Sequence, residues 1–298
     1  MQWYKIKEKS AGKFRLILSL YLYKIFGKKV LNIIAFFVSF FTFIGNKDLR
    51  KYSKNYFKIL YDYTKNEKLK PSVINSLKHV LSYSYSLVDK IEAYLQNFKS
   101  ENIEFFSEED KIAYLNDINN KGVFVLCNHT GNIDILRSLF SSNKYPLKSN
   151  VSVFLQKNHC KIFNEFIDKF KINIEKIKIC PVEEIDISSA NILDEDLKKG
   201  GIAFMAGDRV SDNNVKCSDM DFLNKKIRLP EGAFRFAKIM DTNIYFVSAI
   251  KEKNKYKIYL HKEESKNIKQ IQKDFVDFLE KMTLLAPYQF YNFFDFFV

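Results

Sequence analysis

Two residues that can move a proton stand five positions apart in the stretch VLCNHTGNIDILRSL, residues 125–139: His129 and Asp134. On a continuous helix, positions five apart point about 140° away from each other, so the two side chains can meet only across a bend. Gly131 permits such a bend, Asn132 is a favourable helix N-cap, and Asp134 then falls in the first helical turn, where the helix dipole keeps its carboxylate ionised. The spacing therefore predicts an imidazole that Asp134 holds by one nitrogen and that accepts a proton on the other.

This pair is a base with its orienting acid but without an enzyme nucleophile. No serine stands in a GxSxG turn anywhere in the sequence, so the hydroxyl that the base activates would belong to a substrate. Direct transfer of an acyl group to that hydroxyl is the natural reaction. The alternative is that His129 and Asp134 only cap and tether a helix, because a bare HxxxxD spacing is common by chance.

The other three histidines indicate no second centre. His79 lies in a helical stretch with no second ligand or base nearby, so we expect a packed or surface residue there. His261 follows a strand and is expected at the surface. His159 and Cys160 are adjacent but lack the further ligands that zinc needs. We therefore expect neither a metal nor a bound cofactor.

The elements that must position His129 follow from the hydrophobic pattern. From residue 121 onward, short apolar strands alternate with helical stretches, and this alternation predicts an α/β fold with a mixed, largely parallel sheet flanked by helices. The expected strands are 123–127, 151–155, 202–206, 244–250 and 256–260, and the expected helices are 158–171, 188–199, 232–240 and 266–285. Residues 50–120 show helical periodicity, and we expect one α/β domain over 51–298. His129 then lies at the carboxyl end of a strand, where such sheets bind ligands.

The first 50 residues have a different character. Residues 30–45 carry no charge, and this uncharged stretch is short for a transmembrane helix and long for an ordinary core helix. Basic residues flank both ends, so charge gives no crossing direction. We expect residues 1–50 to form a membrane-associating helical segment that lies in or dips into one leaflet, with a spanning helix and a plain core helix as alternatives.

Composition narrows the class of partner. The formal charge is +13, and 42 of the 48 basic residues are lysines, which favours an anionic membrane surface or an acidic partner over nucleic acid. Aromatic residues make up 16% of the chain, which suggests contact with apolar material. The four cysteines show no CxxC spacing and are interpreted as reduced core thiols of a cytosol-facing protein.

The stretch HTGNID resembles the HxxxxD motif of the lysophospholipid acyltransferase superfamily, and most of all its lipid A late acyltransferase branch. Further stretches are similar to that branch in the same order: WYKIKEKSAGKFRLILSLYLYKIFG, GIAFMAGDRV, RLPEGAFRFAKIMDTNIYFVSAI and PYQFYNFFDFF. The branch typically carries Trp and Glu inside the motif where this chain has Ile133 and Asp134. The acceptor therefore need not be a lipid A precursor.

The resemblance implies His129 as general base on the acceptor hydroxyl and Asp134 as its orienter, with Gly131 and Asn132 shaping the loop. It also implies an O-acyltransferase that takes a fatty acyl group from a thioester to a lipid or glycolipid, at the cytoplasmic face of the bacterial inner membrane. The lysine-rich surface favours acidic acyl carrier protein over coenzyme A as the donor.

Three further residues are candidates for substrate binding. Asp208 and Arg209 follow a strand, and a guanidinium suits a phosphate or a carboxylate. Arg137, one turn past Asp134, would face the same site or neutralise that carboxylate. The aromatic tail, residues 287–297, either contacts the membrane or plugs the core. Two other functions stay open: a thioesterase, in which water replaces the acceptor, and a membrane-binding protein without turnover.

Overall fold

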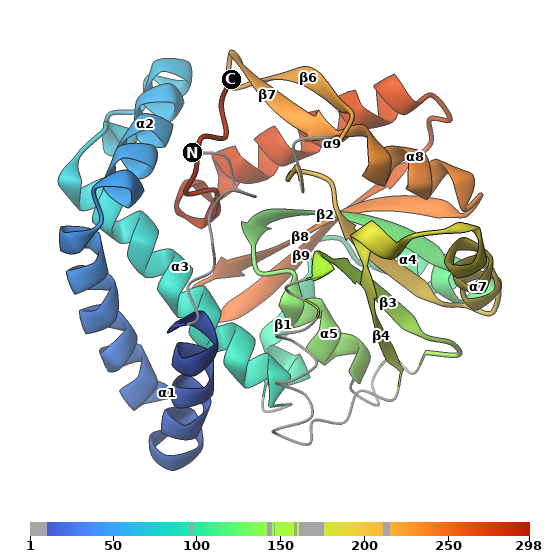
Figure 1. Cartoon of the computed structure of the whole chain (residues 1–298), viewed down its shortest axis with the longest axis horizontal. Helices are drawn as coiled ribbons and strands as arrows, with labels where there is room; N and C mark the ends of the chain where they lie inside the picture. The colour runs from blue at the N-terminus through green and yellow to red at the C-terminus, as the bar shows by residue number, and fades with distance from the viewer. Residues whose placement is uncertain are drawn as a thin grey trace.

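A seven-stranded sheet forms the centre of the protein and has the strand order β1-β9-β8-β2-β5-β3-β4 (Figure 1). This computed structural model describes residues 11–95, 98–141, 145, 147–157, 160, 176–210 and 215–298. The predicted α/β fold with a mostly parallel sheet is confirmed. The domain boundary expected at residue 50 falls inside helix α2 (Lys47–Thr64).

Five strands run in one direction, and two run against them. The parallel set is β2 (Val123–Gly131), β3 (Val151–Leu155), β4 (Ile177–Pro181), β5 (Ile202–Ala206) and β8 (Asn243–Glu252). Strand β9 (Lys255–Glu263) returns antiparallel to β8, and β1 (Ile103–Phe105) pairs with β9 in parallel. A separate hairpin joins β6 (Cys217–Phe222) to β7 (Lys225–Pro230). All five predicted strands are present.

Strand β2 is buried on both faces because its side chains alternate between two apolar cores. Phe124 and Leu126 belong to the core shared with helices α7 (Ile187–Lys198), α8 (Glu231–Ile239) and α9 (Ile268–Leu285). Val123 and Val125 belong to the core shared with α4 (Glu108–Lys121) and α5 (Asp134–Ser141). A central strand packed on both faces gives the residues at its carboxyl end a rigid base. The helix predicted over 158–171 lies, apart from Cys160, outside the described residues.

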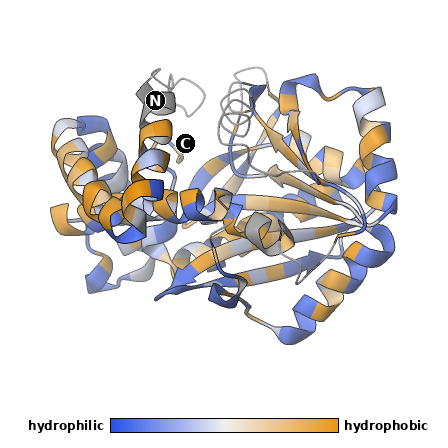
Figure 2. Ribbon diagram, turned by 90° about the horizontal axis from the view of Figure 1, so that it is seen from below, coloured by the Kyte–Doolittle hydropathy of each residue, from blue (hydrophilic) through white to orange (hydrophobic). Residues whose placement is uncertain are grey.

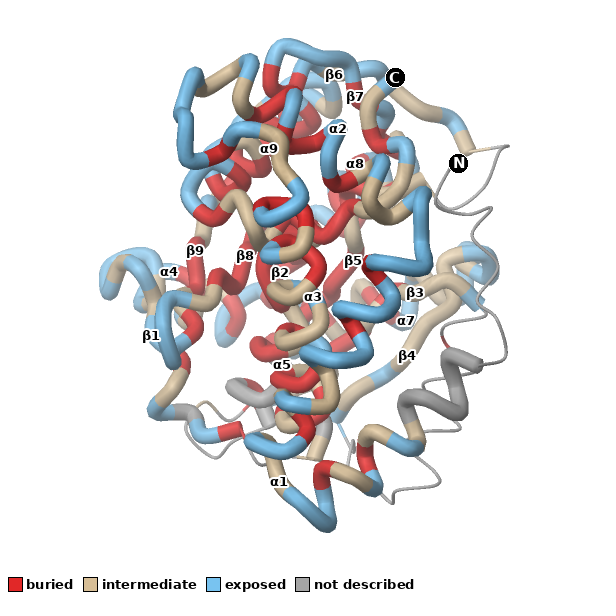
Figure 3. Tube along the Cα trace, turned by 90° about the vertical axis from the view of Figure 1, so that its left-hand side faces the viewer, coloured by how far each residue is buried: buried red, intermediate tan, exposed pale blue. Residues whose placement is uncertain are grey.

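Helices α1 (Ala11–Gly45), α2 and α3 (Val73–Tyr94) stand at one end of the sheet (Figure 1). In α1 the backbone leaves helical geometry at Gly27, where φ is 73°. Residues 17–45 are long and apolar enough to cross a membrane by length and composition, and their most apolar window is only 11% buried. In Figure 3, residues 17–45 of α1 are mostly exposed or intermediate, which does not fit the alternative of a plain core helix.

The aromatic tail packs inside the protein. After α9, the short helix η5 (Pro287–Gln289) leads to Phe290, which is fully buried, and Tyr291, which is 7% exposed. The Phe290 ring stacks on Tyr56 of α2 at 5.0 Å between centroids. Of the two roles considered for this tail, the core plug is the one that the packing supports.

Candidate functional site

The carboxyl end of β2 is irregular, and this irregularity sets the orientation of His129. The register between β2 and β8 shifts between Cys127 and Gly131, as at a β-bulge, which redirects side chains locally. Gly131 has φ 82°, and a Cβ there would lie 2.0 Å from the carbonyl oxygen of Ala249. Only glycine fits this close approach, so the backbone at this position depends on Gly131.

Buried polar groups lock the same turn. The Asn128 side chain, 2% exposed, donates from Nδ2 to Ser248 Oγ at 2.9 Å and accepts the Thr130 N–H at 2.9 Å. Sequence reasoning did not single out Asn128, although its place beside the histidine at the end of a strand was a usable signal. Satisfied buried hydrogen bonds of this kind fix a single conformation.

His129 is held by Asp208. Its Nδ1 lies 2.7 Å from Asp208 Oδ1, and its backbone N–H donates to Asp208 Oδ2 at 2.9 Å. Asp208 is 1% exposed and follows β5, the strand next to β2. A carboxylate accepts hydrogen bonds, so this contact places the imidazole proton on Nδ1. The imidazole is 33% exposed, and its Nε2 has no hydrogen-bond partner among the residues that the structure describes.

The charges around this pair favour neutral imidazole beside an ionised acid. Burial lowers the pKa of His129, the positive charge of Arg209 lowers it further, and Asp208 opposes both without reversing them. Burial alone would raise the pKa of Asp208, but His129 and then Arg209 outweigh it, so this pKa lies below its usual value. At neutral pH, Nε2 of His129 can therefore accept a proton.

Asp134 is not the partner of His129, which corrects the prediction from the HxxxxD spacing. Strand geometry continues through Gly131, so the chain carries Asp134 away from the imidazole instead of folding back onto it. Asp134 does begin α5, as expected, and its Oδ2 pairs with Lys90 of α3 at 2.6 Å. Within the described residues, the acid that orients His129 is Asp208.

Asn132 tethers the loop to α3 and does not cap α5 with its side chain. Its Nδ2 donates to the Ser86 carbonyl at 2.8 Å, and its N–H donates to the Ala249 carbonyl at 2.8 Å. With 6% exposure it supports the loop from within and presents little surface to a substrate. Arg137 lies in α5, but its side chain is outside the described part, so its predicted role stays a prediction.

Arg209 binds the C-terminal tail. Its Nε donates to Asn292 Oδ1 at 3.0 Å and its Nη2 to the Tyr291 carbonyl at 2.8 Å, while the guanidinium lies 5.7 Å from the centre of the Phe294 ring. Arg209 thus uses its Nε and Nη2 donors on the tail, whereas the phosphate or carboxylate binding expected from the sequence would need such donors for a substrate.

The tail also contacts His129 and Asp208, the pair that we call the dyad. The Tyr291 N–H donates to the His129 carbonyl at 2.9 Å, and Asn292 Nδ2 lies 3.5 Å from Asp208 Oδ2. Sequence reasoning missed Asn292, because no local pattern links it to residues about eighty positions earlier in the chain. The tail is therefore part of the structure that positions His129.

His79 and His261 lie apart from this pair, and His159 is outside the described residues. His79 is fully buried between Ser53 Oγ, 3.1 Å from Nδ1, and the Phe290 carbonyl, 2.7 Å from Nε2, and burial lowers its pKa to about 4. His261 is exposed, as expected. Burial raises the pKa of the Cys127 thiol, which keeps it protonated and inert. The described residues contain no group of ligands suited to a metal ion.

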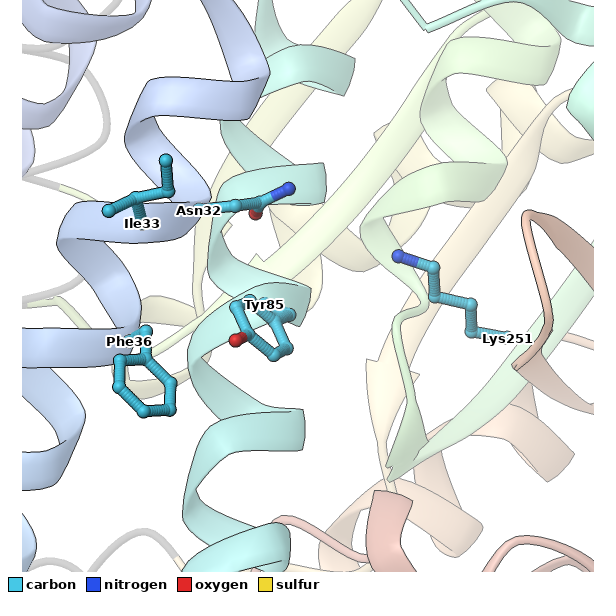
Figure 4. Close-up of a pocket in the computed structure, with 5 residues that line it drawn as sticks. All are labelled: Asn32, Ile33, Phe36, Tyr85 and Lys251. Atoms are coloured by element: carbon cyan, nitrogen blue, oxygen red, sulfur yellow. The ribbon is translucent and has the colours of Figure 1, made fainter.

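A pocket of about 440 Å³ opens between α1, α3 and β8 (Figure 4). Asn32, Ile33 and Phe36 of α1 line it together with Tyr85 of α3 and Lys251 near the carboxyl end of β8. Lys251 is two positions beyond Ala249, the residue that pairs with Gly131. Lys251 thus lies toward the carboxyl ends of the parallel strands, as His129 does, and α/β proteins bind ligands at that end of the sheet.

No protein-family model matches this chain, and no curated protein sequence does. A neutral imidazole with one nitrogen fixed by a buried carboxylate and the other without a partner in the described part of the chain has the geometry that a general base needs.

Proposed function

We propose that this protein is a membrane-associated O-acyltransferase. Its substrates would be a fatty-acyl thioester and the hydroxyl group of a lipid or glycolipid. The single observation that carries the proposal is the 2.7 Å contact of His129 Nδ1 with Asp208, which leaves Nε2 of a partly exposed imidazole without a hydrogen-bond partner among the described residues. The resemblance of the HTGNID stretch to the lysophospholipid acyltransferase superfamily supports the same reaction.

In the proposed reaction, His129 Nε2 takes the proton of the acceptor hydroxyl as the oxygen attacks the thioester carbonyl carbon. The carbon–sulfur bond then breaks, and the leaving thiolate takes that proton from the imidazolium, so the products are an ester and a thiol. Asp208 stabilises the imidazolium and fixes its orientation. No covalent enzyme intermediate is required, which agrees with the inert state of the Cys127 thiol.

The substrates are proposed from charge and apolar surface. Acyl carrier protein is the proposed donor, because an excess of lysine attracts an acidic protein. The acceptor is proposed to come from the membrane, which the apolar helix α1 would contact at its cytoplasmic face. Asp134 and Lys90 lie on α5 and α3 near the dyad, and the Lys90 charge contributes to the low pKa of His129.

The test combines a labelled donor with mass spectrometry. Purified protein is mixed with acyl carrier protein bearing labelled acyl chains and with a total membrane lipid extract. We expect a labelled lipid that is one acyl group heavier with the wild type and with His261→Ala, and none with His129→Ala. His261 is the matched control because it is an exposed histidine away from the dyad.

Two outcomes would contradict the proposal. Labelled free fatty acid without labelled lipid would identify a thioesterase, in which water takes the place of the acceptor. Equal product from the wild type and His129→Ala would remove His129 from the mechanism and favour a membrane-binding protein without turnover.

A further inference from the structure

Exposed apolar side chains gather on one helix. Of the 24 exposed large apolar side chains among the described residues, 12 belong to α1, and Ile33, Phe37, Phe41 and Ile44 are all more than half exposed. Figure 2 shows hydrophobic stretches, in orange, along the helices that stand beside the sheet. Exposed apolar side chains that gather on one element of a folded protein mark a contact with a partner or a lipid.

The second half of α1, residues 28–45, has one face in contact with the protein and the other outside. Leu31, Ser39 and Phe43, at spacings of eight and four, are buried, and Leu31 shares an apolar cluster with Val88 of α3. Ser39 Oγ also hydrogen-bonds to Ser84 Oγ of α3. A water-facing helix would carry polar residues on its outer face. Here the outer face is apolar as well, so it fits a non-aqueous environment.

Ion pairs hold the kink of α1 to the rest of the protein. Lys28 Nζ lies 2.8 Å from Asp89 Oδ1 and 2.6 Å from Glu92 Oε2, and Tyr23 OH donates to Glu92 at 3.2 Å. Burial alone would lower the pKa of Lys28, but Asp89 and Glu92 outweigh it and raise this pKa. Asp89 is 1% exposed, so separating α1 from α3 would leave a buried carboxylate with one partner fewer, which is costly.

Because of the kink, each arm of α1 is close to the lower limit of length for a crossing. Residues 11–26 and 28–45 are about 24 Å and 27 Å long at roughly 1.5 Å per residue, whereas the hydrocarbon core of a bilayer is about 30 Å thick. Residues 17–54 contain seven basic residues and one acidic residue, at the kink and after the second arm. Equal signs at both ends fit one layer of anionic headgroups and give no direction for a crossing.

We propose that α1 lies in the plane of one anionic membrane leaflet and does not cross the bilayer. The kink at Gly27 lets both arms stay against α3 while their outer faces enter the lipid. This inference concerns how the protein meets the membrane, and it holds or fails independently of acyl transfer.

The first test is flotation with vesicles, in which charges are placed on the outer face of α1. We expect Phe37→Glu with Phe41→Glu to lower the bound fraction of the protein at least tenfold on vesicles that contain phosphatidylglycerol. The matched control is Ile187→Glu with Ile239→Glu, because these side chains are 83% and 71% exposed and lie on α7 and α8 at the other end of the molecule (Figure 1). The control should bind as the wild type does, and equal binding by all three proteins would overturn the proposal.

The second test separates an in-plane helix from a spanning one. Lys29→Cys and Lys47→Cys flank the second arm, and both positions are exposed. Each is placed in a chain whose four native cysteines are replaced by alanine, and the protein is bound to sealed vesicles. A membrane-impermeant maleimide should label both positions from outside. Labelling of only one of them before detergent is added would show a crossing and overturn the proposal.

Light scattering without vesicles tests whether a second copy of the chain binds the exposed apolar face of α1. We expect the wild type and the Phe37→Glu, Phe41→Glu variant to have the same mass. A wild-type dimer that the variant breaks into monomers would assign the face to self-association and overturn the membrane proposal.

Discussion

Replacing Asp208 by asparagine should abolish most of the acyl transfer while leaving the fold in place. The carboxylate accepts two hydrogen bonds from His129, one from Nδ1 at 2.7 Å and one from the backbone N–H at 2.9 Å. Asn292 Nδ2 adds a third donor, 3.5 Å from Oδ2. Two donors therefore surround the Oδ2 position, so the oxygen of an asparagine would take that place and its NH2 group would face Nδ1.

An NH2 group at Nδ1 needs an acceptor, which moves the imidazole proton to Nε2. Nε2 is the atom that must take the proton of the acceptor, so the base is lost. Such a loss costs on the order of 10²–10⁴-fold in kcat, which equals about 2.7–5.4 kcal/mol of transition-state stabilisation. The lost charge-assisted hydrogen bonds should also lower the free energy of unfolding by about 1.5–3 kcal/mol.

The assay is the rate of labelled ester formation at saturating donor and acceptor at pH 7, with circular dichroism as the check on folding. Asp134→Asn is the matched control, since the same exchange there disturbs a pair with Lys90 whose side chains are 28% and 36% exposed. Asp134 is not the acid that holds His129, so kcat should fall less than about tenfold, and the free energy of unfolding should change by only roughly 0–1 kcal/mol, as for other partly exposed pairs. A loss above a hundredfold in Asp134→Asn, with Asp208→Asn near the wild type, would refute this reasoning and restore the pairing expected from the sequence.

Three further changes test the loop, the buried histidine and the tail. Gly131→Ala should lower the free energy of unfolding by roughly 2–4 kcal/mol, because the φ of Gly131 is 82° and the new Cβ would meet a backbone carbonyl. The control is Gly232→Ala, where the new Cβ has open space, and equal effects of the two variants in denaturant titrations would contradict this reasoning. His79 has a native pKa of about 4, below its unfolded value, so the unfolded state binds more protons than the native state. The free energy of unfolding of the wild type should therefore fall by about 3 kcal/mol as the pH falls from about 6.5 to 4, whereas His79→Gln should not show this loss. Arg209→Met removes a positive charge that lowers the pKa of His129, so this pKa should rise and the acidic limb of the pH–rate profile should move to higher pH. An unchanged acidic limb would show that the Arg209 charge does not act on His129.

Much of the fold could be predicted because the signals are local. The apolar runs at 123–127 and 202–206 are bounded by polar turns, and both became parallel strands at the centre of the sheet. Strands β1 and β6 were missed for physical reasons. The first is only three residues long, and the second, CSDMDF, alternates polar and apolar residues at the surface as one half of a hairpin.

The site was predicted in part. His129 was found because a histidine at the exit of a buried strand is a local feature, whereas its partner depends on strand order. β5 lies beside β2 although about eighty residues separate them, and this neighbour relation brings Asp208 to the imidazole. The residue was singled out, but with a role in substrate binding. The bulge that keeps Asp134 away is a feature of pairing with β8, which no short motif reveals.

The tautomer of His129 tests the central claim most directly. Histidine nitrogen NMR on protein labelled with ¹⁵N-histidine, with the signal assigned by its loss in His129→Gln, reports which ring nitrogen carries the proton. A base oriented by Asp208 requires a neutral ring at pH 7 with the proton on Nδ1 and a pKa below about 6.5. A proton on Nε2, or an imidazolium at pH 7, would mean that His129 cannot take a proton from an acceptor hydroxyl and would contradict the account.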